Sequence, residues 1–394
     1  MKAVILAAGE GLRLRPFTED KPKVMLPVAN KPILHHVIDS INNTSIEEII
    51  VVIGYQKNKI LQYFDKYSNK KVRFIEQKKQ LGTAHALLMA ESFVDDDFIV
   101  VFGDNLIGSE SLQKLIDSNY NSGLLITHHG HPSKYGVVGV KGKNVESIAE
   151  KPEDKSSQYI ATGVYKFKKN VFDTVKNCVN EGELGLTSVL QSLLYQNDTI
   201  GTIKTSEWSD VVYPYDLLSV NERHLNNINR EISGKIEKNV HIQGPVEIGE
   251  NSQISSGCYL VGPILIGEGC NIGPNTCIFP STVIGNNCVI EPFSSIRNSI
   301  IMEECRIGSH VTMANSILDD GVRINHHVTI IEEQMLISND NKMNKIQNIG
   351  GLIGGNSIIG NHCVIDPGIV IGKGVIIDPL KHIYRNISKE SHVM

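Results

Sequence analysis

Apolar and polar residues follow two different rhythms along the chain, and the change falls near residue 230. Before it, four short apolar runs have the length and composition of buried β-strands: VILAA, IIVVIG, VRFIEQ and DFIVVFGD. Three stretches between these runs repeat apolar residues at helical spacing: ILHHVIDSI, KILQYFDKY and GTAHALLMAESF. This alternation predicts a Rossmann-like α/β domain with a mixed, mostly parallel sheet. Ligands of such sheets bind beyond the carboxyl ends of the strands.

After residue 230, aliphatic residues recur every six positions. The repeat runs from Ile236 to Ile296, changes phase twice, and returns from Ile353 to Ile377. A hexapeptide period indicates three short strands per coil, with one aliphatic side chain of each strand pointing inward. Small residues occupy the position four further on: Ser252, Cys258, Cys270, Thr276, Cys288, Ser294 and Cys363. We therefore interpret most of the cysteines as packing residues.

The two rhythms predict two domains, residues 1–229 and residues 230–387. The segment that joins them, YDLLSVNERHLNNINREI, has apolar residues at helical spacing and predicts a helix. Residues 331–352 are polar and break the six-residue period, which predicts a loop projecting from the repeats. We expect a chain cut near Glu231 to keep part of the first domain's activity.

Composition narrows the function classes. The formal net charge of −5 offers no basic field for nucleic acid. No apolar run reaches the roughly 18 residues that a membrane span needs, and the apolar N-terminus is too short for a signal peptide. The seven cysteines form no CxxC pair, which argues against zinc ribbons and thioredoxin-like motifs. These features predict a cytoplasmic protein.

The segment LAAGEGLRLRP, residues 6–16, directly follows a predicted strand. A glycine-rich loop in this position exposes backbone N–H groups to a phosphate. Arg13 and Lys23 add two cations nearby, and this combination favours a polyanion site over a basic surface turn. Leu14 stands where a nicotinamide fingerprint has its third glycine, and no GKS or GKT follows as in a Walker A loop.

These residues carry a family resemblance. LAAGEGLRLRP followed by KPKVMLP resembles the signature of the sugar-1-phosphate nucleotidylyltransferases, LAAGxGxRLxP…KPKxxxP. Six further motifs follow in the family's order, so the resemblance spans residues 1–225: QKKQLGTAHAL, FGDN, YGVV, EKP, ATGVY and WSDVVYPYDLL. Residues 235–380 resemble the left-handed β-helix of hexapeptide-repeat proteins. The whole chain is similar to the archaeal-type bifunctional N-acetylglucosamine-1-phosphate uridylyltransferase/glucosamine-1-phosphate acetyltransferases and to the long form of glucose-1-phosphate thymidylyltransferase.

The resemblance implies an enzyme that uses Mg²⁺ to transfer a nucleotidyl group from a nucleoside triphosphate to a sugar 1-phosphate. It implies that Arg13 holds the β- and γ-phosphates, that Lys23 contacts the α-phosphate, and that Asp104 and Asp210 hold the metal. The nucleotide-binding residues it implies are Leu6, Ala7, Ala8, Gly9, Gly11, Gln77, Gly82 and Thr83. The sugar-phosphate-binding residues it implies are Gly136, Glu150, Lys151 and Thr162.

The identity of the two substrates is partly open. A carboxamide at Gln77 offers a pyrimidine edge both a donor and an acceptor, which favours UTP or dTTP over a purine nucleotide. Ala161 stands where N-acetylglucosamine-type uridylyltransferases often have Asn. Both glucose 1-phosphate and N-acetylglucosamine 1-phosphate therefore stay open as acceptors.

The repeat domain departs from the acetyltransferase pattern of the bifunctional relatives, which reads roughly PHLSYVGDS and then GAGT. In GSHVTMANS, Ser309 takes the place of the family's His and Thr312 that of the Tyr, while NHHV at 325–328 replaces GAGT. We therefore expect His310, His326 and His327 at the surface or at an interface. The domain is then an oligomerisation scaffold, typical of a homotrimer or a dimer of trimers, and an acetyltransferase is the alternative.

Two other function classes fit the sequence less well. A non-catalytic regulatory subunit would be expected to lose the residues that handle phosphate and metal, yet all four are present: Arg13, Lys23, Asp104 and Asp210. A nicotinamide-dependent oxidoreductase conflicts with the missing third glycine and with the repeats.

Overall fold

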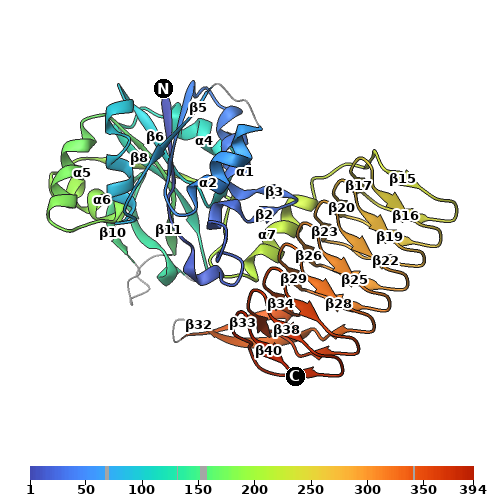
Figure 1. The fold of residues 1–394 in the computed structure, drawn as a ribbon. Helices are drawn as coiled ribbons and strands as arrows, with labels where there is room; N and C mark the ends of the chain where they lie inside the picture. Colours follow the sequence, from blue (N-terminus) through green and yellow to red (C-terminus); the bar gives the residue numbers. More distant parts are fainter. Residues whose placement is uncertain (67–70, 131, 151–157, 340–341) are drawn as a thin grey trace. The chain divides into compact units, whose positions relative to one another are not determined.

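The computed structural model describes residues 1–66, 71–130, 132–150, 158–339 and 342–394. The chain forms two compact units (Figure 1). The first comprises Met1–Gly11, Lys21–Leu26 and Pro32–Asp210. The second comprises Leu12–Asp20, Pro27–Lys31 and Val211–Met394. Two short N-terminal segments thus belong to the second unit, so no single cut of the chain separates the units, and the boundary near residue 230 stays a prediction.

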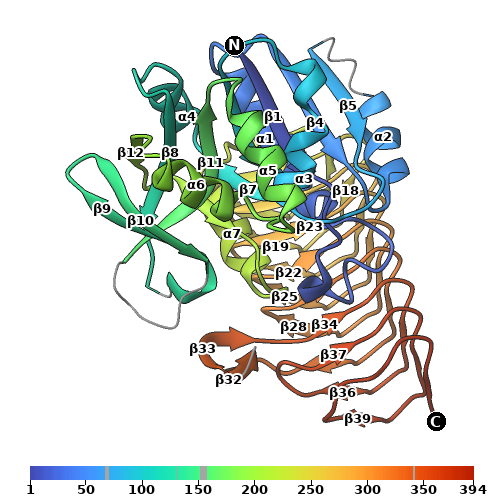
Figure 2. The ribbon, with the colours of Figure 1, turned by 90° about the vertical axis from the view of Figure 1, so that its left-hand side faces the viewer.

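A nine-stranded mixed sheet forms the centre of the first unit (Figure 2). Its strands, in spatial order, are β5 (Val72–Glu76), β4 (Glu48–Ile53), β1 (Lys2–Ala7), β6 (Phe98–Phe102), β11 (Tyr159–Phe167), β8 (Ser122–His128), β12 (Ile200–Lys204), β10 (Asn144–Glu150) and β9 (Gly136–Lys141). The first four are parallel to one another, whereas β11 runs antiparallel to its neighbours β6 and β8. This confirms the predicted α/β class and all four predicted strands.

Helices lie on both sides of this sheet (Figure 1). They are α1 (Ile33–Asn42), α2 (Lys57–Asp65), α3 (Thr83–Leu88), α4 (Ser109–Ile116), α5 (Val171–Asn180) and α6 (Leu186–Tyr195), with short 3-10 turns η1 (Leu12–Leu14), η2 (Lys23–Met25), η3 (Glu91–Phe93) and η4 (Pro132–Lys134). The predicted amphipathic helices are confirmed as α1, α2 and α3. In α1, Ile33, Val37 and Ile41 are buried at helical spacing, which is the pattern that predicted it. Within the described ranges, no helix is both long and apolar enough to cross a bilayer.

The second unit is a β-helix of three stacked parallel sheets. The first sheet contains β14 (Glu231–Ile232), β17 (Val246–Ile248), β20 (Ile264–Ile266), β23 (Thr282–Ile284), β26 (Ile300–Ile301), β29 (Ile317–Leu318), β34 (Leu352–Ile353) and β37 (Val370–Ile371). The second contains β15 (Lys235–Ile236), β18 (Gln253–Ile254), β21 (Asn271–Ile272), β24 (Val289–Ile290), β27 (Arg306–Ile307), β30 (Arg323–Ile324), β35 (Ile358–Ile359), β38 (Ile376–Ile377) and β40 (His392–Val393). The third contains β16 (His241–Gln243), β19 (Tyr259–Val261), β22 (Cys277–Ile278), β25 (Ser295–Arg297), β28 (Thr312–Ala314), β31 (Thr329–Ile330), β36 (Val364–Ile365) and β39 (His382–Ile383).

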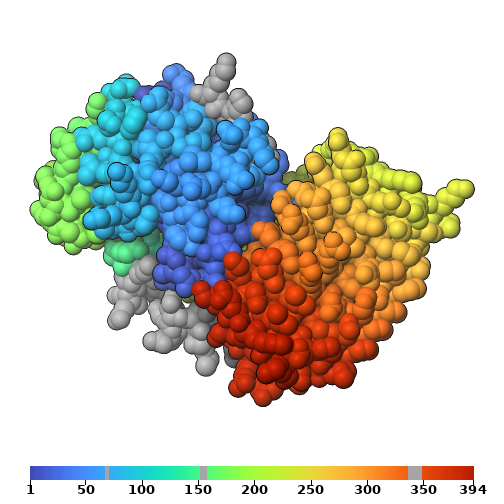
Figure 3. Space-filling view, in the orientation of Figure 1, coloured from blue at the N-terminus to red at the C-terminus, as the bar shows by residue number. Residues whose placement is uncertain are grey.

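Inward aliphatic side chains form the core of this β-helix, as the six-residue period predicts. Ile272 pairs with Ile290, eighteen residues on, whereas Ile290 pairs with Ile307, seventeen on. Ile307 in turn pairs with Ile324, again seventeen residues on. The two phase changes in the sequence are therefore two successive shorter coils, and the inward column continues through both. Successive coils appear as bands from yellow to red in the space-filling view (Figure 3).

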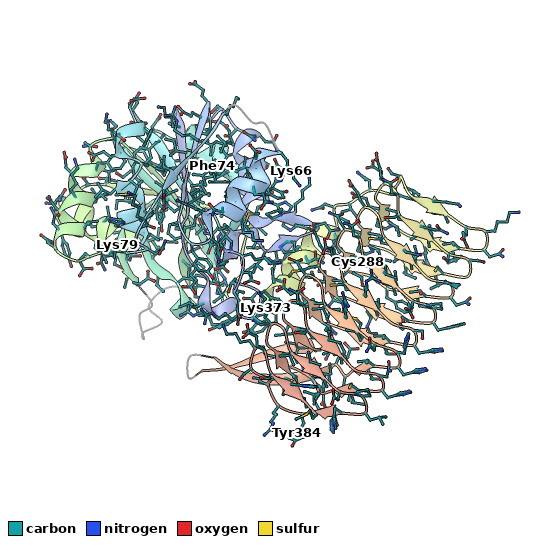
Figure 4. All side chains as sticks on the ribbon, in the orientation of Figure 1. Lys66, Phe74, Lys79, Cys288, Lys373 and Tyr384 are labelled. Carbon is teal, nitrogen blue, oxygen red and sulfur yellow. The ribbon has the colours of Figure 1, made fainter. Side chains whose placement is uncertain are left out.

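Five cysteines of the repeats are packing residues of the core, as expected for most of the cysteines. Cys270, Cys288 (labelled in Figure 4) and Cys305 lie in the core, and the thiol of each contacts a backbone carbonyl of the next coil. The thiol of Cys288 and then burial raise the pKa of Cys270. At Cys288 the contact with Cys270 lowers the pKa, but the thiol of Cys305 and burial raise it further, so both stay protonated. All seven cysteines are free thiols.

Two further elements complete the second unit. The joining segment forms the helix α7 (Asp216–Leu225), as predicted. Residues 331–352 contain an antiparallel hairpin of β32 (Glu333–Asn339) and β33 (Lys342–Ile349). The hairpin interrupts the coil sequence, so Ile324 pairs with Ile359 on the following coil.

Candidate active site

The glycine-rich loop leaves the carboxyl edge of the parallel strands. Leu6 of β1 is in register with Phe102 of β6, and the amide of Gly103 donates to the carbonyl of Leu6 over 2.9 Å. The loops after β1 and β6 therefore start side by side. Gly9 is exposed, and a side chain there would meet nothing within 4 Å, so its backbone is open to a ligand. Leu6, Ala7 and Ala8 are buried beneath this loop.

The two predicted metal ligands lie on paired segments. Asp104 precedes β7 (Asn105–Ile107), and Asp210 ends β13 (Trp208–Asp210). The two strands are antiparallel, with Asp210 opposite Asn105. Carboxylates far apart in the sequence are thus brought to neighbouring positions. The phenol of Tyr135 donates to Asp210 Oδ1 over 3.0 Å and helps to orient that carboxylate.

Lys23 reaches the same place from η2. Its ammonium lies 2.5 Å from Asp104 Oδ2, with side-chain exposures of 16% for Lys23 and 29% for Asp104. A half-buried pair of this kind puts a positive charge beside the carboxylates, where a phosphate would need it. Arg13 lies exposed in η1, which clusters with the second unit, whereas Gly11 and Lys23 belong to the first.

The carboxylate pair fits a hard divalent cation. Two aspartates supply oxygen ligands, and such a cation takes its remaining ligands from substrate phosphates and water. Over the described ranges, no group of three or more His, Cys, Asp or Glu side chains has the arrangement of a metal site.

The predicted base-binding residues meet at the start of α3. Gln77 is 2% exposed and follows β5, and its Nε2 donates to the carbonyl of Gly82 over 3.2 Å. Nε2 also lies 2.8 Å from Nδ1 of His85. Because both hydrogens of the amide are thereby used, the carbonyl oxygen Oε1 is the part of Gln77 left for a base.

Gly82 is required for this arrangement. Its φ of +139° is disfavoured for side chains, and a Cβ atom would lie 2.4 Å from the carbonyl oxygen of Leu184. Thr83 follows as the first residue of α3, and its hydroxyl accepts a hydrogen bond from the amide of Leu186 over 2.9 Å. Gln77, Gly82 and Thr83 are therefore held as one rigid corner.

The predicted sugar-phosphate residues divide into two groups. Gly136 and Glu150 are register partners on the hairpin β9–β10, and the exposed Glu150 carboxylate accepts from Thr187 over 2.8 Å. Thr162 is buried, and its hydroxyl donates to the carbonyl of Leu125 over 2.9 Å. The carbonyl of Thr162 accepts hydrogen bonds from the side chains of Asn105 and Trp208. The backbone of Thr162, and not its hydroxyl, therefore faces the strands β7 and β13. Lys151 lies outside the described residues.

Several residues of this region were not singled out from the sequence: Asn105, Tyr135, Thr187, Trp208 and His85. Four of them, Asn105, Tyr135, Trp208 and His85, belong to motifs that the family resemblance names, so the motif context could have found them. Thr187 lies outside these motifs, and only the folded chain brings its hydroxyl to the carboxylate of Glu150. Behind the site, burial and then the charge of Glu150 raise the pKa of Tyr165, which stays a neutral phenol.

In the β-helix, the histidines lie at the surface as expected. His310, His327 and His362 stack ring on ring, with centroids 4.7 Å apart. Ser309 Oγ lies 3.0 Å from Nδ1 of His326, and Glu291 Oε2 lies 3.3 Å from the same nitrogen. A catalytic serine–histidine–glutamate arrangement needs the serine at one ring nitrogen and the carboxylate at the other. Here both groups contact the same nitrogen of His326, so the three residues do not form such an arrangement.

Comparisons with known proteins identify the family of the chain. Residues 2–227 match the family model described as nucleotidyl transferase, and residues 260–393 match one described as the GMPPB C-terminal domain. A protein of Methanococcus maripaludis named bifunctional protein GlmU is 41% identical, with 100% of this chain and 97% of the relative covered. The UTP–glucose-1-phosphate uridylyltransferase AglF of Haloferax volcanii is 34% identical over 55% of this chain and 93% of its own length.

A solved structure resembles the N-terminal part of the chain. It is a Bacillus anthracis protein named as a glucose-1-phosphate thymidylyltransferase, in complex with sucrose. The TM-score is 0.53 at 26% identity, with 59% of this chain and 98% of that chain covered. Together with the full-length similarity to the GlmU proteins and the family match across more than half of the sequence, this places the chain in the nucleotidyl transferase family.

Proposed function

We propose that this protein transfers a nucleotidyl group from UTP or dTTP to a sugar 1-phosphate and releases pyrophosphate, with Mg²⁺ as cofactor. The observation that carries the proposal is the meeting of Lys23, Asp104 and Asp210 beside the loop that follows β1. Carboxylates, a cation and open backbone amides at the carboxyl edge of a parallel sheet suit a triphosphate and its metal.

The proposed reaction needs no nucleophilic side chain. A phosphate oxygen of the sugar 1-phosphate attacks the α-phosphorus, the bond to the β-phosphate bridge oxygen breaks, and pyrophosphate leaves with the electron pair. Lys23 neutralises charge at the α-phosphate and Arg13 at the β- and γ-phosphates, so catalysis rests on position and charge. A divalent cation held by Asp104 and Asp210 supplies further charge neutralisation when bound.

Gln77 supports the choice of a uracil or thymine base. Its free acceptor Oε1 suits the N3–H donor of these bases, whereas cytosine has an acceptor at the same ring position. The backbone of Leu6, Ala7, Ala8, Gly9 and Gly11, together with Gly82 and Thr83, is proposed to complete the nucleotide site.

Glu150 is proposed to accept hydrogen bonds from sugar hydroxyls, beside Gly136 and near Thr187. A Cβ atom at Gly136 would lie 3.5 Å from the Glu150 carboxylate, so glycine leaves room for a ring there. The acceptor is glucose 1-phosphate or N-acetylglucosamine 1-phosphate. Thr162 and Lys151 complete the proposed sugar-phosphate residues.

The deciding experiment is a pyrophosphate-release screen of the purified full-length protein. It crosses UTP, dTTP, CTP, GTP and ATP with the 1-phosphates of glucose, N-acetylglucosamine, galactose and mannose, with and without Mg²⁺. We expect release with UTP or dTTP and with one of the first two sugars. Release with no combination would refute the proposal, and release confined to GTP or CTP would refute the base assignment.

The second unit is proposed to be a scaffold for a homotrimer or a dimer of trimers in the cytoplasm. Light scattering of the full chain tests this, and a monomer would contradict it. Acetylation of glucosamine 1-phosphate with acetyl-CoA is the second candidate, because the full-length relatives are named bifunctional. The shared nitrogen of His326 and the replacement at Ser309 and Thr312 count against it.

A further inference from the structure

The N-terminal segment 12–20 lies on the last coils of the β-helix. The carboxylate of Asp20 forms an ion pair with the ammonium of Lys373, which stands between β37 and β38 and is labelled in Figure 4. Glu19 Oε2 lies 3.7 Å from Nζ of Lys389, on the following coil. Both acidic residues at the end of the segment are therefore matched by lysines of the repeats.

Pro16 adds an apolar contact to the same coils. A Cβ atom built at Gly354 would lie 2.9 Å from Cβ of Pro16, besides 2.7 Å from the amide of Lys373. Gly354 directly follows β34, in the same position of its coil as Met302 after β26 and Asp319 after β29, so this position of the coil accepts a side chain. A Cβ atom at Gly354 would meet both the backbone of the next coil and Pro16.

A second contact holds the other flank of the signature. Residues 27–31 follow the KPKVMLP motif, and the amide of Ala29 donates to Oδ1 of Asn221 on α7 over 3.0 Å. The side-chain amide of Asn30 donates to the carbonyl of Ile284 over 2.8 Å. Segments 12–20 and 27–31, on either side of Lys21–Leu26, are thus both fastened to the second unit.

We propose that Lys373 and Lys389 are positioning residues for the nucleotidyl transfer, which hold the segment that carries Arg13. The proposal rests on the proposed function. After η1, segment 12–20 consists of turns. Its path is held by the buried side chains of Leu14 and Phe17 and, at its end, by the ion pairs with the two lysines. Asp20, then the charges of Glu19 and Glu390, raise the pKa of Lys373, so it is a cation at neutral pH.

The side chains of Lys373 and Asp20 are 31% and 56% exposed, so this pair contributes little to global stability. A misplacement of about 1 Å, by contrast, can cost on the order of 10²-fold in rate. Losing the pair should therefore affect the reaction much more than the fold.

The test compares kcat/KM for the nucleotide in full-length variants with matched melting temperatures. We expect Lys373→Ala to lower it about 5-fold and Lys373→Glu on the order of 10²-fold, while Lys373→Arg stays near the wild type. Asp20→Lys combined with Lys373→Glu restores the pair and should recover much of the loss. The control is Lys114→Ala, which removes an exposed lysine–glutamate pair within α4 and should change nothing.

Gly354→Ala offers an independent test against Pro16, with Gly249→Ala as its control. The control meets the same coil backbone at 2.7 Å, but no atom of the N-terminal segment is among its nearest neighbours. We expect Gly354→Ala to reduce kcat/KM more than Gly249→Ala. Equal losses in the two variants, or wild-type rates in both Lys373→Ala and Lys373→Glu, would overturn the proposal.

Hydrogen exchange separates this inference from the proposed function. Without substrate, peptides covering residues 12–20 should exchange faster in Lys373→Glu than in the wild type. In Lys114→Ala their exchange rate should equal that of the wild type. If the wild type releases no pyrophosphate but exchange responds in this way, the nucleotidyl transfer fails while the fastening of the segment holds. Unchanged exchange in Lys373→Glu overturns the fastening itself.

Discussion

Replacing Asp104 by alanine probes the carboxylates and Lys23 at once. The change removes the 2.5 Å contact with the Lys23 ammonium and leaves that side chain, 16% exposed, without its carboxylate. Because the pair is only partly buried, we expect a loss of about 1–2 kcal/mol in the free energy of unfolding. A loss of this size leaves the domain folded at room temperature.

The effect on the reaction should be far larger than the effect on the fold. One of the two proposed metal carboxylates is lost, and Lys23 no longer has a fixed position. By analogy with the loss of one preorganised electrostatic group, we expect kcat to fall about 10²–10³-fold. Pyrophosphate release with the preferred nucleotide and sugar measures this, and a titration with Mg²⁺ should require more metal for half-maximal rate.

Asp95→Ala is the matched control, because Asp95 also pairs with a lysine, at 2.7 Å from Nζ of Lys2, but stands 76% exposed on a separate loop. It should leave turnover unchanged. A purified, folded Asp104→Ala protein that turns over at a near-normal rate would show that the site has been assigned wrongly.

Four further outcomes are expected. Gln77→Ala should lower kcat/KM for UTP about tenfold and narrow the preference for UTP over CTP, measured by pyrophosphate release, since a buried acceptor is lost. A chain cut near Glu231 should release pyrophosphate more slowly than the full chain in the same assay, because segments 12–20 and 27–31 lose the coils on which they lie, and it should keep part of the activity, as expected from the sequence. Stability in urea should fall as the pH drops below about 6.5. Desolvation and then the neighbouring histidines lower the pKa of His327, so the native state binds fewer protons there than the unfolded chain. In His327→Asn, where asparagine tolerates the φ of +57°, the free energy of unfolding should therefore depend less steeply on pH. Thiol release from acetyl-CoA with glucosamine 1-phosphate should stay at background in the wild type, and robust release that vanishes in His310→Ala would contradict the scaffold assignment.

The sequence by itself determined the fold class. Short apolar runs located β1, β4, β5 and β6, because strands buried on both faces are apolar throughout. Helical spacing located α1, α2 and α3, because one face of each helix is buried. The six-residue period located the β-helix, because each coil repeats the same inward position. Even the two changes of phase after Ile296 were visible, although only the registers of Ile290 with Ile307 and of Ile307 with Ile324 identify them as shorter coils.

The sequence also picked out the residues proposed for the site, but not how they meet. Asp104 and Asp210 become neighbours only through the antiparallel pairing of β7 with β13. Lys23 joins them through its contact with Asp104, which lies 81 residues further along the chain. Thr187 is placed beside Glu150 in the same way. Such partners are chosen by the packing of whole elements, and no local spacing encodes that choice.

The attachment of the signature segment was decided entirely by tertiary structure. Nothing in LRLRPFTED indicates that it lies on coils more than three hundred residues away, where Lys373 and Lys389 meet its acidic end. A repeat gives every coil the same inward pattern, so the pattern cannot say which outer residues face another segment. That information resides in the outward side chains, whose identity is free of the repeat and whose partners appear only once the chain has folded.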